Sequence, residues 1–230
     1  MTYAITQWRY SLVSLLAHAT YIAWTYWLGL EYFFTSVFFG LLATNLTIGL
    51  YIHRTLAHRM YNLSDKANYF LLCLTSCMNF GSAAVSAAVH VNHHKYSDTN
   101  ADPHSVKNIG LFRFLIKDWR VTYKPHTKTF LRVTKNEHVL KQHRNHFWLA
   151  IASALLTPYL VVWGFWLLNF HFLLNHRNGN PVNINWAYPV MWGEERHKDH
   201  HLMPSERKMH NYDLLYYIGV WLEEKNNGAS

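Results

Sequence analysis

The stretch from His90 to His104, HVNHHKYSDTNADPH, begins with three histidines at positions i, i+3 and i+4. On an α-helix these offsets fall on one face, so the imidazoles of His90, His93 and His94 are predicted to point in the same direction. Neutral imidazole is a common metal ligand and suits iron, copper, zinc and nickel. The stretch therefore predicts one side of a metal site.

Two further clusters extend this pattern. The chain holds 17 histidines in 230 residues, and the remaining clusters are HRTLAH upstream and HKDHH downstream, which contribute His53, His58, His197, His200 and His201. Each cluster stands near the end of an apolar run, which chance placement of histidines does not explain. Together the three clusters offer eight ligands, enough for two metal ions.

The charge and hydropathy pattern restricts the class of protein. Half of the residues are apolar and the formal net charge is +8, but the apolar residues are concentrated in runs separated by charged, histidine-rich stretches. This pattern is typical of membrane helices that carry a polar cap. Because the basic residues do not alternate with aromatics as in a nucleic-acid-binding surface, we exclude nucleic acid as the partner. The charge favours an anionic membrane surface, an acidic electron donor or a phosphate-bearing substrate.

The first two apolar runs predict a helical hairpin. Residues 8–30 and 32–52 are each long enough to cross a hydrocarbon core of roughly 30 Å, and only Glu31 separates them. Of the 21 lysines and arginines, only Arg9 precedes Ile52. The positive-inside rule then puts His53, the N-terminus and the metal site on the cytoplasmic face.

The later apolar runs complete an all-α membrane bundle. The run from Ala67 to Val89 is predicted to form one helix at the interface or within the bundle, since a crossing would separate His90 from His53. Residues 147–174, interrupted by Pro158 and Gly164, are too few for two full spans and predict a short or re-entrant hairpin. We expect one domain over residues 1–230, with a hairpin (8–52), a cap (53–146), a second hairpin (147–176) and a second cap (177–230).

The three clusters resemble the histidine boxes of the membrane-bound fatty-acid desaturases, especially the acyl-CoA Δ9, stearoyl-CoA type. GLYIHRTLAHR, HHKYSDTNADPH and GEERHKDHH are each similar to the flanked boxes of that family. The resemblance implies a ninth histidine ligand between the last membrane helix and the third box. His176 is the best counterpart and His171 is the alternative. Phe172 stands where family members often have Asn, and Val91 where the second box often has Arg.

The resemblance also implies the chemistry. Nine histidines would hold two iron ions, with zinc as a substitute on expression, and O2 would be the co-substrate for placing a cis double bond in an acyl chain, with Δ9 the expected position. The acyl carrier would be coenzyme A, acyl carrier protein or a membrane lipid, and the sequence does not distinguish among the three. A separate ferredoxin or cytochrome b5 would supply electrons.

Other histidines and several acids have weaker predictions. His18, His126, His138, His143, His146 and His210 follow no ligand spacing, and structural or solvent-facing roles are favoured for them. Five acids near the clusters are candidates to bond the outer imidazole nitrogens, with solvated surface charge as the equal alternative. These acids are Asp98, Asp102, Glu194, Glu195 and Asp199.

Two competing functions remain. A related histidine-box hydroxylase or oxidase acting on a lipid, alkane, sterol or carotenoid would keep the metal centre and change the product. A metal-binding membrane protein without catalysis, such as a zinc transporter, would place its ligands near the bilayer midplane, whereas these clusters stand at the ends of apolar runs.

Overall fold

The chain is helical throughout the part that the structure describes. A computed structural model describes residues 8–97, 99–102, 105–112, 125–176 and 180–223, and the β-structure among them is one isolated bridge between Leu63 and Glu223. The longer helices are α1 (Trp8–Thr44), the π-helix η1 (Asn45–Ala57), α2 (Asp65–Ser76), α3 (Ala83–Tyr96), α7 (Glu137–Leu156) and α8 (Pro158–Asn175). The shorter ones are α4 (Val106–Ile109), α6 (Thr127–Val133), η3 (Asn185–Ala187), α9 (Tyr188–Met191), η4 (Glu194–Arg196), α10 (His197–Leu202) and α11 (Leu214–Leu222). The all-α prediction is confirmed for these residues.

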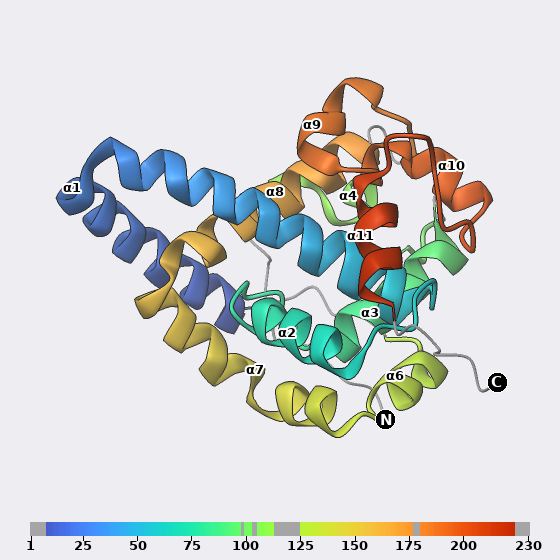
Figure 1. Cartoon of the computed structure of the whole chain (residues 1–230), viewed down its shortest axis with the longest axis horizontal. Helices are drawn as coiled ribbons and strands as arrows, with labels where there is room; N and C mark the ends of the chain where they lie inside the picture. The colour runs from blue at the N-terminus through green and yellow to red at the C-terminus, as the bar shows by residue number, and fades with distance from the viewer. Residues whose placement is uncertain (1–7, 98, 103–104, 113–124, 177–179, 224–230) are drawn as a thin grey trace.

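Helix α1 folds back on itself to form the predicted hairpin (Figure 1). The reversal occurs at Gly29, with φ 80° and ψ −170°, and it brings the Tyr21 hydroxyl within 2.6 Å of Ser36 Oγ on the other arm. The prediction that Glu31 marks the turn was wrong by two residues. A positive φ is accessible to glycine because it lacks a Cβ atom, so Gly29 makes the turn and Glu31 lies in the following helical arm.

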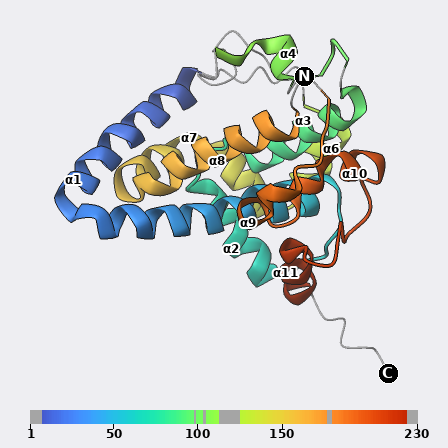
Figure 2. The same ribbon diagram turned by 90° about the horizontal axis from the view of Figure 1, so that it is seen from above.

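Helix α8 lies between the two arms of α1 (Figure 2). The Trp163 indole donates to Tyr21 Oη and Ser36 Oγ, each at 3.2 Å, and the Trp166 indole donates to His18 Nε2 at 3.0 Å. Helices α7 and α8 meet at an angle of 110°. The predicted interruption at Pro158 is correct, because proline begins a helix readily but cannot continue one, whereas Gly164 lies inside α8.

The expectation of one helix from Ala67 to Val89 was wrong. The chain forms α2 and α3 there, separated by a link in which Asn79 and Gly81 have φ of 55° and 78°. The Asn79 side chain donates to the Tyr10 carbonyl at 3.1 Å, so the link is anchored to the start of α1. Ser82 then caps α3 by accepting from the Val85 amide.

Among the described residues, one helix has the length and composition to cross a membrane, and a second span exists if a bent helix pair counts as one. The helix is Arg9–Ala57, and the bent pair is formed by α7 and α8. The arms of α1 expose large apolar side chains, among them Ile22 at 68%, Trp27 at 86% and Phe34 at 66%. Apolar exposure of this extent along one helix indicates contact with another apolar phase or partner.

Candidate metal centre

The π-helix η1 explains the spacing of the first histidine cluster. In a π-helix the amide of residue i bonds to the carbonyl of residue i−5, so residues five apart are stacked along one side. The His58 amide donates to the His53 carbonyl at 3.1 Å, and the Thr55 hydroxyl donates to the Leu50 carbonyl at 2.9 Å. An α-helix would turn two residues five apart by about 140° from each other. The π geometry instead directs His53 and His58 to the same site.

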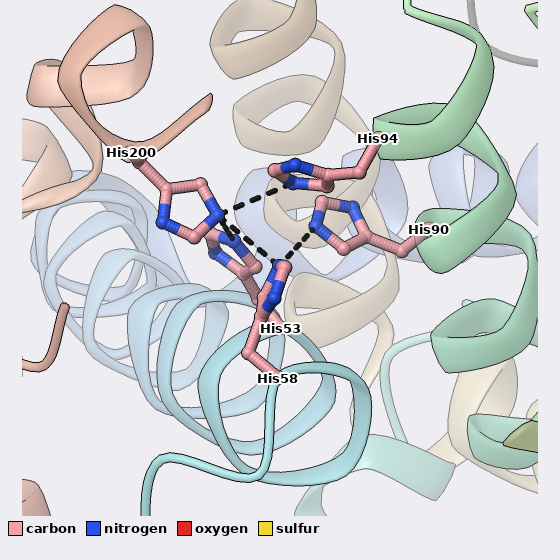
Figure 3. A group of neighbouring side chains, drawn as sticks. All are labelled: His53, His58, His90, His94 and His200. Atoms are coloured by element: carbon pink, nitrogen blue, oxygen red, sulfur yellow. Dashed lines mark hydrogen bonds between the residues drawn. The ribbon is translucent and has the colours of Figure 1, made fainter. Parts of the chain in front are cut away.

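Helices α3 and α10 each divide their three histidines between two groups. The five-histidine group consists of His53, His58, His90, His94 and His200, which Figure 3 shows converging from η1, α3 and α10. The four-histidine group consists of His93, His176, His197 and His201. In each group one nitrogen from every ring lies within 4.8 Å of all the others.

The division is crossed between the two helices. In α3 the i and i+4 histidines join the five-histidine group and the i+3 residue, His93, joins the other. In α10 the i and i+4 histidines join the four-histidine group and the i+3 residue, His200, joins the first. Each H-x-x-H-H cluster therefore bridges both groups, which holds the groups next to each other.

The ring nitrogens that converge in both groups are Nε2 atoms. In the five-histidine group His200 Nε2 lies 2.7 Å from His53 Nε2 and 3.1 Å from His58 Nε2. In the four-histidine group His176 Nε2 lies 2.8 Å from His197 Nε2 and 3.1 Å from His93 Nε2. Several lone pairs aimed at one point repel each other unless a cation lies between them. These all-nitrogen donor sets fit two transition-metal ions.

Buried acids fix the orientation of one ring in each group. His53 Nδ1 bonds to Glu194 Oε2, and His93 Nδ1 bonds to Asp102 Oδ1 at 2.8 Å. With Nδ1 engaged by a carboxylate, Nε2 is left as the ligand atom, and the carboxylate raises its basicity. The prediction of outer partners is confirmed for Glu194 and Asp102.

Two other predicted acids, Glu195 and Asp199, bond to residues outside the two groups in the part of the chain that the structure describes. Glu195 accepts from His210 Nε2 at 2.5 Å and from the Gly193 amide at 2.8 Å. Asp199 accepts from Asn183 Nδ2 at 2.9 Å. Asp98 lies outside the described residues. Spacing along the sequence alone did not separate these acids from Glu194 and Asp102.

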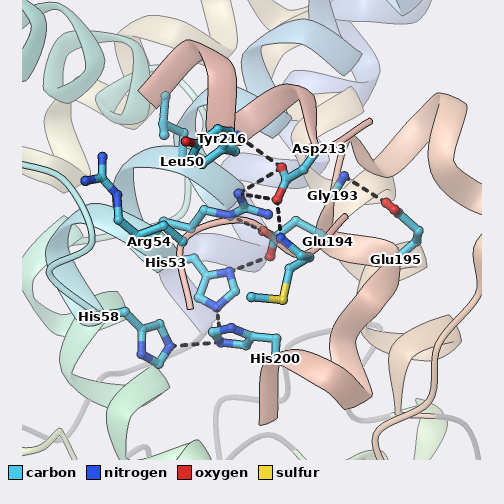
Figure 4. Close-up of polar contacts among 12 residues, drawn as sticks. Leu50, His53, Arg54, His58, Gly193, Glu194, Glu195, His200, Asp213 and Tyr216 are labelled. Carbon is cyan, nitrogen blue, oxygen red and sulfur yellow. Dashed lines mark hydrogen bonds and ion pairs between the residues drawn. The ribbon is translucent and has the colours of Figure 1, made fainter. Parts of the chain in front are cut away.

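The Glu194 carboxylate that bonds to His53 belongs to a buried ion-pair network (Figure 4). Arg54 donates to Glu194 Oε1 at 2.9 Å and to both oxygens of Asp213 at 2.9 and 3.0 Å. The Arg54 side chain is 2% exposed and that of Asp213 is fully buried. Sequence reasoning missed Asp213, because a residue 159 positions from Arg54 leaves no local signal.

Burial favours the neutral form of six of the nine ligand imidazoles. Desolvation, with His53 nearby, lowers the pKa of His58 to about 2, and desolvation with His93 nearby lowers the pKa of His201 to about 3. The pKa values of His90, His94, His197 and His200 are lowered for the same reason. Burial raises the pKa of Glu194, but the interactions with His53 and Arg54 outweigh this and lower the pKa to about 2. Neutral imidazoles are ready to bind a cation, because no proton has to leave the ring first.

The structure brings together all nine histidines that the sequence singled out. His176, at the end of α8, belongs to the four-histidine group, whereas the alternative, His171, belongs to neither group among the described residues. His210, expected to be structural or solvent-facing, bonds to Glu195, and His143 and His146 bond to Ser82 and Tyr10.

A cavity of about 190 Å³ lies beside both groups. Its apolar wall comes from η1, α3 and α8 and includes Ile52, Val89 and Phe172. At the metal centre its lining includes His53, His90, His93, His176 and His197. The centre is therefore next to a space that can hold an apolar chain.

Known proteins that are similar to this chain include several named as desaturases. The fatty acid desaturase family profile matches residues 30–191. The sn-1 stearoyl-lipid 9-desaturase of Anabaena variabilis is 29% identical over 181 residues, covering 68% of this chain and 66% of that protein. Acyl-CoA desaturase 1 of Tachysurus fulvidraco is 26% identical, covering 79% of this chain and 58% of that protein. Stearoyl-CoA desaturase 5 of Bos taurus is 25% identical, covering 75% and 55%.

This chain spans 55 to 66% of the length of these three relatives. The family profile covers more than half of this chain and includes the first two histidine clusters and His176. The paired histidine groups then add the third cluster to the same centre. The chain belongs to the membrane fatty acid desaturase family.

Proposed function

We propose that this protein is an O2-dependent fatty acyl desaturase that introduces a cis double bond at Δ9 of a saturated acyl chain. The observation that carries the proposal is the pair of histidine groups, five and four imidazoles, beside an apolar cavity. The relatives named as 9-desaturases and stearoyl desaturases support the position of the double bond.

Two iron ions would be held by the nine histidines, namely His53, His58, His90, His93, His94, His176, His197, His200 and His201. Iron would supply the oxidising power that no side chain provides. The protein residues fix the ligand atoms: Glu194 and Asp102 hold the rings of His53 and His93, and Arg54 neutralises Glu194. These partners tune the basicity of the ligands and limit reorganisation of the site.

The cavity would align the saturated chain with the metal centre. Desaturation converts two adjacent CH2 groups, O2, two electrons and two protons into a CH=CH unit and two water molecules. Ile52, Val89 and Phe172 provide the apolar contacts that favour an alkyl chain there. Holding both CH2 groups beside one centre makes their reaction effectively intramolecular.

We further propose that the protein is embedded in a membrane with its metal site on the cytoplasmic face. The exposed apolar side chains of α1 support the embedding, and the charge distribution along the sequence supports the orientation. The segments 8–52 and 147–176 would form the two membrane hairpins, and 53–146 and 177–230 would form the cap. The orientation is tested by labelling Glu31→Cys and Lys198→Cys variants in sealed cells with a thiol reagent that does not cross the membrane. Labelling at position 198 from outside would refute the orientation.

A separate ferredoxin or cytochrome b5 would reduce the irons, and the net charge of +8 supports an acidic donor. Stopped-flow reduction rates measured against ionic strength test this proposal. Rates that fall with added salt are expected, and rates independent of salt would contradict a charge-steered donor.

The function is tested by fatty acid analysis in a host that lacks desaturases and supplies a competent electron donor. Cells expressing the wild type or His200→Ala are compared by gas chromatography and mass spectrometry after derivatisation of double bonds. A Δ9 monounsaturated acid present only with the wild type is expected. Analysis of coenzyme A, acyl carrier protein and lipid fractions at early times identifies the acyl carrier.

Other outcomes of the same analysis would refute the proposal. A hydroxylated chain would identify the protein as a hydroxylase of this family. If the membrane fraction forms no new product and the natively purified protein retains zinc, a metal-binding protein without catalysis is favoured.

A further inference from the structure

The end of the π-helix η1 depends on a side chain from another helix. A helix leaves its last carbonyls without an amide partner from a further turn, and in the π pattern these are the last five, residues 53–57. The first three accept from backbone amides that follow the helix, at 2.9 to 3.2 Å. The last two, those of Leu56 and Ala57, accept from Arg132 Nη2 at 2.6 and 3.3 Å. Arg132 therefore completes the hydrogen bonds at this end of η1.

Helix α6, which carries Arg132, is in turn fixed to α3. The His126 amide at the start of α6 donates to the Ala88 carbonyl of α3 at 3.0 Å, two residues before His90. Phe130 and Val133 of α6 are each 6% exposed and belong to the same core cluster as residues of η1 and α3. Helix α6 therefore joins the end of η1 to α3 close to the metal centre.

The two elements that α6 joins supply most of one histidine group and little of the other. His53 and His58 come from η1 and the residue after it, and His90 and His94 come from α3, which makes four of the five-histidine group. His58 Nε2 lies 3.1 Å from His90 Nε2. The four-histidine group takes only His93 from these elements. A change at the end of η1 should therefore affect the first group and spare the second.

The charge of Arg132 is directed at backbone carbonyls. In the part of the chain that the structure describes, carboxylates pair with Arg54, Arg196 and Arg207 and not with Arg132. A cation at the C-terminal end of a helix bonds the last carbonyls and complements the negative end of the helix dipole. This placement is suited to holding the end of η1.

Without Arg132, another backbone arrangement would satisfy these carbonyls better. Ala57 is 6% exposed, so water has little access to replace the guanidinium there. An α-helical end would pair both carbonyls with amides four residues later. It would also turn His58 by about 140° from His53 and remove it from the group.

We propose that Arg132 is a positioning residue that keeps the end of η1 in the π pattern and so directs His58 to the five-histidine group. It acts through the backbone of η1 and contacts neither metal nor substrate. The inference rests on the proposed function, because it needs a metal ion at the five-histidine group.

Iron(II) binding to the metal-free full chain in detergent, measured anaerobically by chelator competition, tests this role without turnover. His201→Ala leaves the five-histidine group as the intact site, and His94→Ala leaves the four-histidine group. Adding Arg132→Leu to His201→Ala should weaken iron binding about ten- to a hundredfold, the effect of losing a charge-assisted hydrogen bond. Adding it to His94→Ala should change the affinity by less than about twofold, because that group takes no ligand from η1.

Two further variants separate positioning from general effects of charge. Lys128→Leu is the matched control, since Lys128 is exposed one turn earlier on α6. It should change the iron affinity of either group by less than about twofold, as is usual for a surface substitution. Arg132→Lys keeps a charged donor and should recover most of the affinity that Arg132→Leu loses.

Several results would overturn the inference. Unchanged iron affinity in His201→Ala with Arg132→Leu is one, and an equal loss in both backgrounds, which a merely structural role would produce, is another. If Arg132→Leu does not fold, Arg132→Gln is compared in the same two backgrounds. Failure of both to fold would show that Arg132 supports the whole fold, which also refutes a role confined to one group. If neither His201→Ala nor His94→Ala binds iron before Arg132 is changed, the proposed function is refuted instead.

Discussion

Replacing Asp213 by Asn should destabilise the protein much more than removing a surface acid. Asp213 pairs with Arg54, and both side chains are buried at 0% and 2% exposure. Asp213 accepts the Met209 amide on Oδ2 and the Tyr216 amide on Oδ1, at 3.0 Å each, and Asn keeps the shape but an oxygen for only one of them. The substitution therefore removes the charge that balances Arg54 and one amide hydrogen bond.

The structure sets the size of the effect. Breaking a buried ion pair typically costs about 3–5 kcal/mol because a desolvated charge is left behind. Glu194 still pairs with Arg54 at 2.9 Å, so we expect the lower end, about 3 kcal/mol. For a chain of this size that corresponds to a fall of about 6–12 °C in the thermal midpoint.

Glu223→Gln is the matched control. Glu223 also pairs with an arginine, Arg207, at 2.6 Å, but the two side chains are 25% and 39% exposed. Solvent screening limits such a pair to about 0–1 kcal/mol, so the midpoint should fall by less than about 4 °C. Tryptophan fluorescence during heating of the detergent-solubilised protein measures both variants. Equal shifts for the two variants would refute the claim that the buried network stabilises the site.

Three further predictions concern the metals and protons of the centre. His94→Ala and His201→Ala should each reduce the metal content of the purified protein from about two ions to about one, while His138→Ala keeps both. Elemental analysis measures this, and full retention by either ligand variant would contradict the grouping. Asp102→Asn should weaken metal binding about 10- to 100-fold, because it removes the outer partner of His93; chelator competition that gives the wild-type affinity would argue against this role. Iron(II) binding to the metal-free protein at pH 6.5 should release almost no protons from the six histidines whose pKa values are lowered, because these rings are already neutral, whereas six rings with the ordinary pKa of about 6.5 would release about three. Calorimetry in buffers of different ionisation enthalpy counts the protons, and release of about three from these rings would show ordinary pKa values. The six histidines are His58, His90, His94, His197, His200 and His201.

The histidine set was predictable because its signal is local. The i, i+3 and i+4 spacing places side chains on one helix face whatever the tertiary structure, and it predicted six of the nine histidines as sets of three. The crossed division of His93 and His200 between the two groups was not predictable, since it depends on how α3 and α10 face each other. The convergence of His53 and His58 follows from a π-helix, and the composition of the segment did not distinguish the π hydrogen-bond pattern from that of an α-helix.

The features of the fold that depend on hydropathy were predictable, and those that depend on local backbone geometry were not. The apolar runs gave the α1 hairpin and the interruption at Pro158. The turn at Gly29 and the link near Asn79 depend on positive φ angles, and composition averaged over a run does not show them. Asp213 could not be predicted as a partner of Arg54, because only the packing of α11 against η1 brings the two together.

The central claim is that this chain holds two iron ions through nitrogen ligands in the two histidine groups. The most direct test is elemental analysis of natively purified protein combined with iron X-ray absorption spectroscopy. About two irons per chain, with first-sphere scattering from nitrogen and outer scattering typical of imidazole, are the expected result. A single metal ion per chain, or a first sphere dominated by carboxylate oxygen or sulfur, would contradict the account.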